Sequence, residues 1–179
     1  MNLPNLISLG RILAVPLTVW LVITGQFMFA FWVFIAAGIS DAIDGIIAKR
    51  FNAETVLGAF LDPLADKALL VSIYVTLGHE ALIPMWLVIL VVFRDLLILG
   101  GAILFHTITH TLTMDPLKIS KINTLLQIVL AAAVLWQLAF GIDIGVANDI
   151  MIFAVAISTF ISGGAYVITW TRLASKMEE

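Results

Sequence analysis

The residues best suited to chemistry are four aspartates in two pairs, Asp41 with Asp44 and Asp62 with Asp66. Spacings of three and four residues put the members of each pair on one face of a helix. Two antiparallel helices with a short connection would bring the pairs together, and carboxylates at close range need compensating cations. Oxygen ligands suit Mg²⁺, Mn²⁺ or Ca²⁺, while the absence of Cys and the presence of only three His argue against zinc. The aspartates therefore predict a site for divalent cations.

The chain that carries these aspartates is strongly apolar, because 62% of its 179 residues are hydrophobic and 12% are charged. Soluble domains average about 45–50% and about 25%, so the composition predicts one polytopic membrane domain over residues 1–179. The formal net charge of -3 provides no basic surplus, so we expect no nucleic-acid partner. Without cysteine, disulfides and thiol nucleophiles are excluded.

Six stretches of low charge can form membrane-spanning helices, each of which needs about 20 mostly apolar residues. We predict an all-α fold with transmembrane helices over 11–24, 27–48, 62–78, 83–105, 119–140 and 148–172. The segment before Arg11 lacks the early positive cluster and the cleavage site of a signal peptide. We therefore predict a short N-terminal interfacial helix that is retained in the mature protein.

The positions of Lys and Arg predict the orientation of these helices. Eight of the nine cations flank connections on one side, and the opposite connections contain none. The positive-inside rule assigns the cation-rich side to the cytoplasm. We expect a multi-pass protein of a bacterial inner membrane, with both termini and the aspartates facing the cytoplasm. The eight cations are Arg11, Lys49, Arg50, Lys67, Lys118, Lys121, Arg172 and Lys176.

A structural alternative exists for each aspartate taken singly, because carboxylates at a membrane interface also solvate helix ends and pair with nearby cations. Ionisable residues in spans nevertheless indicate function by default, and four at this spacing favour a site. Two glycines in the same segment, Gly45 and Gly58, would permit close approach of a ligand to the backbone.

The segment resembles the signature of the CDP-alcohol phosphotransferases, Asp-x2-Asp-Gly-x2-Ala-Arg-x8-Gly-x3-Asp-x3-Asp. Lys49 departs from it by standing at the Arg position, which keeps the charge but not the bidentate fork. The six-span layout also agrees with this family over the whole chain. The matching residues are Asp41, Asp44, Gly45, Ala48, Lys49, Gly58, Asp62 and Asp66.

The resemblance implies a membrane enzyme that transfers the phosphatidyl group of CDP-diacylglycerol to an alcohol and releases CMP. It also implies two divalent cations, Mg²⁺ or Mn²⁺, among the aspartates, and a homodimer. The implied roles are metal ligation by Asp41, Asp44 and Asp62, both ligation and general-base catalysis by Asp66, and donor binding by Gly45, Ala48, Lys49 and Gly58.

The remaining cations bear on the identity of the acceptor alcohol. The candidate acceptor-binding residues are Arg94, Lys118 and Lys121. The chain resembles two subgroups, which use phosphatidylglycerol (cardiolipin synthases) or glycerol 3-phosphate (phosphatidylglycerophosphate synthases). The second subgroup carries Gly-Lys-x-Lys-Thr where this chain has Ser-Lys-Ile-Asn-Thr, so Asn123 replaces a lysine. A phosphomonoester needs more cations than a diester, which favours phosphatidylglycerol; glycerol 3-phosphate is the alternative, because Lys118 can restore the charge.

Purely structural interpretations remain open for Arg94 and Lys121. Arg94 and Asp95 can form a buried structural ion pair, and Lys121 can be a cation that extends to the membrane interface. A transporter is the main rival class, but its ionisable residues would be expected near the midplane and within inverted repeats. A catalytically inactive scaffold is disfavoured by the intact set of aspartates. His106 and His110 share a helix face but lack a third metal ligand nearby.

Overall fold

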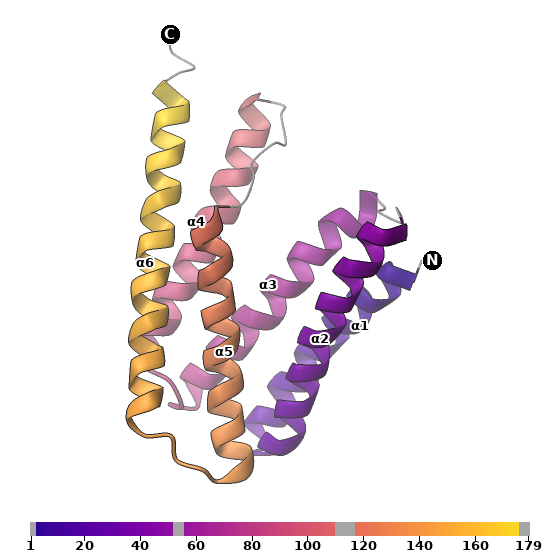
Figure 1. Cartoon of the computed structure of the whole chain (residues 1–179), viewed down its shortest axis with the longest axis vertical. Helices are drawn as coiled ribbons and strands as arrows, with labels where there is room; N and C mark the ends of the chain where they lie inside the picture. The colour runs from indigo at the N-terminus through magenta and orange to yellow at the C-terminus, as the bar shows by residue number, and fades with distance from the viewer. Residues whose placement is uncertain (1–2, 52–55, 110–116, 176–179) are drawn as a thin grey trace. The chain divides into compact units, whose positions relative to one another are not determined.

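The computed structural model describes the backbone of residues 3–51, 56–109 and 117–175, and side chains within 10–40, 67–103, 117–172 and 175. The described residues form six α-helices and no strand, which confirms the predicted all-helical fold (Figure 1). The helices are α1 (Leu3–Ile23), α2 (Phe27–Phe51), α3 (Val56–His79), α4 (Met85–Thr109), α5 (Lys118–Phe140) and α6 (Val146–Ser175).

Several helices extend beyond the predicted spans, because hydropathy detects only the apolar part of a helix. The segment predicted as a short interfacial helix forms the first turns of α1 and continues into the span without a break. Pro4 lies in that first turn, where a missing N–H group is tolerated. The start of α3 at Val56, six residues before the predicted 62, has the larger consequence, because it places Gly58 inside the helix.

Three helices are long and apolar enough to cross a membrane along their described residues, namely Met85–Ile103, Lys118–Phe140 and Val146–Arg172. The described parts of α1, α2 and α3 contain shorter apolar stretches, Gly10–Ile23, Phe27–Ser40 and Lys67–His79. Many large apolar side chains on these helices are exposed, as expected where lipid replaces water. The chain is an integral membrane protein.

The helices divide into two compact units, the first formed by residues 1–83 and 131–145. In this unit α1 packs against both α2 and α3, and its core includes the fully buried Tyr74 and Leu77. A tight turn joins α1 to α2, and Gly25 adopts the left-handed conformation there with φ of 72°. This arrangement brings the start of α1, the end of α2 and the start of α3 to the same end of the unit (Figure 1).

The second unit consists of residues 84–130 and 146–179, so it contains α4, the first half of α5 and α6. Here α4 packs against α6, with Leu87, Val91 and Val155 among the buried apolar residues. The two helices approach closely at Gly101, because the indole ring of Trp170 on α6 lies directly over this glycine. This unit buries an unusual set of polar side chains, which belong to the candidate site described next.

Candidate functional site

The aspartate motif lies on the second half of α2 and the first half of α3. The helical backbone places Asp41, Asp44, Gly45 and Ala48 at positions that share one face of α2. The early start of α3 likewise puts Gly58, Asp62 and Asp66 on one face, at successive spacings of four residues.

The side chains of this motif, and those of residues 41–66 in general, lie outside the described residues. The predicted ligand set Asp41, Asp44, Asp62 and Asp66 therefore stays a prediction, as do the donor-binding roles of Gly45, Ala48, Lys49 and Gly58. Among the side chains that are described, no group of three or more His, Asp or Glu could hold a metal ion.

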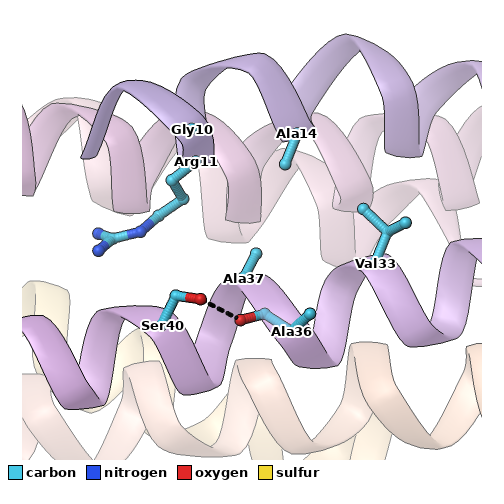
Figure 2. Close-up of a pocket in the computed structure, with 7 residues that line it drawn as sticks. All are labelled: Gly10, Arg11, Ala14, Val33, Ala36, Ala37 and Ser40. Atoms are coloured by element: carbon cyan, nitrogen blue, oxygen red, sulfur yellow. Dashed lines mark hydrogen bonds between the residues drawn. The ribbon is translucent and has the colours of Figure 1, made fainter. Parts of the chain in front are cut away.

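A cavity of about 330 Å³ lies between α1 and α2 in the first unit (Figure 2). Most of the described residues that line it are small and apolar, and the one charged residue among them is Arg11, which is 3% exposed. Ser40 lines the cavity and donates a hydrogen bond to the Ala36 carbonyl at 2.7 Å. Ser40 directly precedes Asp41, the first aspartate of the motif, in the sequence. The remaining lining residues are Gly10, Ala14, Val33 and Ala37.

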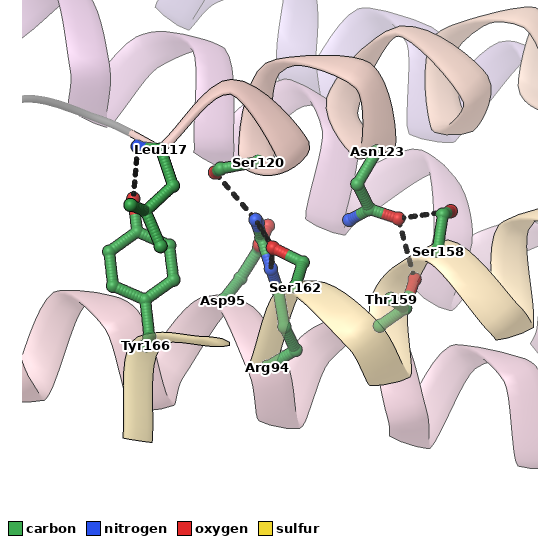
Figure 3. Close-up of polar contacts among 9 residues, drawn as sticks. All are labelled: Arg94, Asp95, Leu117, Ser120, Asn123, Ser158, Thr159, Ser162 and Tyr166. Carbon is green, nitrogen blue, oxygen red and sulfur yellow. Dashed lines mark hydrogen bonds and ion pairs between the residues drawn. The ribbon is translucent and has the colours of Figure 1, made fainter. Parts of the chain in front are cut away.

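Arg94 is the centre of a buried polar network in the second unit (Figure 3). Its side chain is 3% exposed, and Nη1 contacts Asp95 Oδ1 at 2.6 Å. Nη2 donates to Ser120 Oγ on α5 and to Ser162 Oγ on α6, both at 2.6 Å, and Nε reaches Ser162 Oγ at 3.2 Å. The buried ion pair left open by the sequence is thus confirmed, and it joins three helices rather than serving α4 alone.

Asn123 organises a second buried cluster, one turn further along α5. Its Oδ1 accepts hydrogen bonds from the hydroxyls of Ser158 at 2.7 Å and Thr159 at 2.9 Å, both on α6. Asn123 is fully buried, and its Nδ2 has no hydrogen-bond partner among the described residues. A lysine in this place could not accept either hydrogen bond, so Asn123 is an integral part of the α5–α6 contact in this chain.

Sequence reasoning did not identify the α6 residues of these networks. Ser158, Ser162 and Tyr166 follow one another at spacings of four, so they form a polar stripe along one face of an apolar helix. This spacing of four residues was the signal in the sequence that could have identified them. It is a weak signal, because Ser is common in membrane helices.

Lys118 and Lys121 lie in the first turn of α5, and both are exposed. Neither has a hydrogen bond or an ion pair with any residue that the structure describes. Their ammonium groups can therefore contact an anion, whereas the guanidinium of Arg94 is already engaged by Asp95, Ser120 and Ser162. Of the three predicted acceptor-binding cations, two are accessible and one is enclosed.

Comparison with known proteins decides the family. A model described as CDP-alcohol phosphatidyltransferase matches residues 1–161. The chain belongs to this family. The match confirms the resemblance drawn from the aspartate motif, and it covers α1 to α5 and the first half of α6.

Two kinds of phosphatidyltransferase occur among the relatives. A rice chloroplastic CDP-diacylglycerol–glycerol-3-phosphate 3-phosphatidyltransferase is 36% identical over 80% of this chain and 49% of its own length. The human cardiolipin synthase (CMP-forming) is 33% identical over 92% of this chain and 60% of its own length. A Bacillus subtilis CDP-diacylglycerol–glycerol-3-phosphate 3-phosphatidyltransferase is 29% identical over 92% and 93%, respectively. The chain spans about half the length of the rice relative.

Proposed function

We propose that this chain is a phosphatidyltransferase that moves the phosphatidyl group of CDP-diacylglycerol to a glycerol-bearing alcohol. The observation that carries the proposal is the complete aspartate motif in helical register on α2 and α3, in a chain that matches the family over residues 1–161. The names of the relatives support the same class of reaction.

In the proposed reaction, the acceptor hydroxyl oxygen forms a bond to the phosphorus that carries diacylglycerol. The bond from this phosphorus to the bridging pyrophosphate oxygen breaks, and CMP leaves with the electron pair. The hydroxyl proton passes to the carboxylate of Asp66, which acts as general base. Lys49 faces the phosphate charge of the donor, and Gly45, Ala48 and Gly58 leave room for it beside the helices.

We propose that two divalent cations, Mg²⁺ or Mn²⁺, are held by Asp41, Asp44, Asp62 and Asp66. The donor set fits such ions, because it offers only carboxylate oxygens and the chain has no cysteine. Bound there, the cations would neutralise charge on the pyrophosphate and on the attacking oxygen.

The acceptor that the described residues support best is phosphatidylglycerol, which makes the chain a cardiolipin synthase. Of the three candidate acceptor-binding cations, Lys118 and Lys121 have no partner among the described residues, whereas Arg94 is engaged by Asp95, and Asn123 provides a neutral amide. One phosphodiester requires less compensation than a phosphomonoester of about twice the charge. Glycerol 3-phosphate is the second candidate, because the rice and Bacillus relatives are named for it.

We also propose that the α1–α2 cavity receives an acyl chain of the donor. The apolar walls suit a hydrocarbon chain, Arg11 supplies a positive charge for a lipid phosphate, and Ser40 connects the cavity to the motif. We further propose that the motif faces the cytoplasm of a bacterial inner membrane, as the distribution of cations indicates, and that the protein acts as a homodimer.

A product assay tests the proposed function. Purified protein in lipid with Mg²⁺ or Mn²⁺ is given CDP-diacylglycerol together with either phosphatidylglycerol or glycerol 3-phosphate. We expect CMP release with phosphatidylglycerol, and its loss in Asp66→Asn. Release without any acceptor, or unchanged release by Asp66→Asn, would contradict the proposed chemistry. A phosphatidylglycerophosphate product would replace the acceptor while leaving the reaction class in place.

A further inference from the structure

We propose that Arg94 and Ser162 are positioning residues that fix the first turn of α5 and thereby place Lys118 and Lys121 for the acceptor. The inference rests on the proposed function, because it assumes that these lysines meet the acceptor phosphate. It gives Arg94 a different task from the direct acceptor contact expected from the sequence.

The guanidinium of Arg94 is held on several sides at once. Asp95 binds Nη1 at 2.6 Å, and Ser162 accepts from both Nη2 and Nε, at 2.6 and 3.2 Å. A planar group with such fixed donors has little freedom to rotate. Its remaining contact, Nη2 to Ser120 Oγ at 2.6 Å, therefore fixes a point on the first turn of α5. Ser120 lies directly before Lys121 and two residues after Lys118 in the sequence.

A second contact from α6 holds the same end of α5. The hydroxyl of Tyr166, a residue only 7% exposed, accepts a hydrogen bond from the Leu117 backbone N–H at 3.4 Å. The first N–H groups of a helix have no partner within the helix, so an external acceptor here stabilises the helix start. Tyr166 stands one turn beyond Ser162 on α6, and both point toward the beginning of α5 (Figure 3).

This arrangement has a functional reason beyond stability. A buried ion pair is a poor source of stability in itself, because apolar residues of similar volume often serve as well. Its geometric specificity is what apolar packing could not provide. Lys118 and Lys121 are exposed and have no described partner that would fix them. Their placement therefore depends on the backbone of the first turn, which the Arg94 network and Tyr166 hold.

The test compares Ser162→Ala with Ser158→Ala. Both variants remove one buried hydroxyl of α6. Ser162 accepts from Arg94 on α4, which in turn binds Ser120, whereas Ser158 donates directly to Asn123 on α5, one turn beyond Ser120. We expect Ser162→Ala to raise the acceptor KM on the order of tenfold, since misplaced binding groups are costly. The donor KM and kcat should change less than twofold. Ser162→Ala and Ser158→Ala should lower Tm by similar amounts, but Ser158→Ala should leave the acceptor KM unchanged. Ser162→Thr keeps the hydroxyl, so its acceptor KM should return to that of the parent protein.

A double-mutant cycle separates positioning from direct contact. In a Lys118→Ala/Lys121→Ala background the acceptor KM is already raised, and Arg94→Lys should raise it no further, because its effect acts through the lysines. An independent and full additional effect of Arg94→Lys would show that Arg94 binds the acceptor itself, and would overturn the inference.

A spectroscopic measurement distinguishes failure of this inference from failure of the proposed function. The chain contains no cysteine, so Lys121→Cys provides a single site for a nitroxide spin label. We expect the label to be more mobile in Ser162→Ala and in Tyr166→Phe than in the labelled parent protein. Ser158→Ala should not change the mobility of the label. Unchanged mobility would overturn the positioning role. Increased mobility in a protein that releases no CMP, or whose acceptor KM ignores the loss of both lysines, would refute the proposed function and with it the acceptor part of the inference.

Discussion

The contact between Gly101 and Trp170 makes the packing of α4 on α6 testable with one methyl group. A Cβ at Gly101 would overlap three atoms of the indole ring, Cη2, Cζ2 and Cζ3 of Trp170. A Cβ at the preceding Gly100 would meet no atom within 4 Å. Gly100→Ala and Gly101→Ala therefore introduce the same methyl group on the same helix, into open space in one case and into a filled position in the other.

The expected magnitudes follow from two opposing terms. Replacing Gly by Ala within a helix stabilises it by up to about 1 kcal/mol. Overpacking costs about 1–3 kcal/mol when a large side chain must leave its rotamer. Gly101→Ala should thus destabilise by up to about 3 kcal/mol, and Gly100→Ala should be neutral or stabilise by up to about 1 kcal/mol. For a chain of this length, 1 kcal/mol corresponds to roughly 2–4 °C in Tm.

The assay is thermal unfolding in one fixed detergent, with both variants and the parent protein measured together. Trp170→Leu provides the decisive control, because removal of the ring should make Gly101→Ala as harmless as Gly100→Ala. Since the tilted rings of Trp170 and Tyr166 are in contact, with centroids 5.7 Å apart, Gly101→Ala should also increase the mobility of a label at residue 121. Equal Tm values for the two alanine variants would refute the close approach of α4 and α6.

Three further predictions concern separate parts of the protein. Chelation of divalent cations should abolish CMP release and Mn²⁺ or Mg²⁺ should restore it; Asp62→Asn should need a higher metal concentration for half-maximal activity, and full activity in excess chelator would contradict the metal site. Ala36→Leu, which fills the α1–α2 cavity, should raise the KM for CDP-diacylglycerol several-fold, whereas Gly38→Leu, whose position faces open space, should not; equal effects would argue against an acyl chain in the cavity. Asn123→Asp should lower Tm more than Asn123→Leu, because it places an ionisable group in a fully buried position; the reverse order would show that the two hydrogen bonds accepted from Ser158 and Thr159, which Leu loses, outweigh the cost of burying the carboxyl group.

The parts of the fold that were predictable are those encoded in local periodicity. Six apolar stretches became six helices, and the turn at Gly25 lies in the gap between the predicted helices 11–24 and 27–48. The extension of α3 back to Val56 was missed although residues 56–61 are apolar, because the charged residues Asp62, Asp66 and Lys67 separate them from the uninterrupted apolar span. It matters for the site because it carries Gly58 into helical register with Asp62 and Asp66.

The partners of Arg94 were not predictable, because they are separated from it by long stretches of chain. Ser120 and Ser162 are 26 and 68 residues away in the sequence, and nothing local relates them to Arg94. Even the contact with Asp95 is unusual, since adjacent residues on a helix do not face each other and the long arginine side chain must reach across. Sequence alone could state only that the pair was either structural or functional.

The contacts of Arg94 and Asp95 allow the pair to be structural and to serve the proposed function at the same time. An arginine in the middle of a membrane helix is costly unless its charge and its donors are satisfied, and Asp95 with two serines satisfies most of them. Asp95, the one acid in this network, is bound to Arg94. The exposed Lys118 and Lys121 are therefore left without a described carboxylate that would neutralise them. Loss of Asp95 would therefore release a buried cation and disturb the anchor of α5 together. An ion pair that is structural by its contacts would in this way keep the charge of α5 available to an anionic lipid.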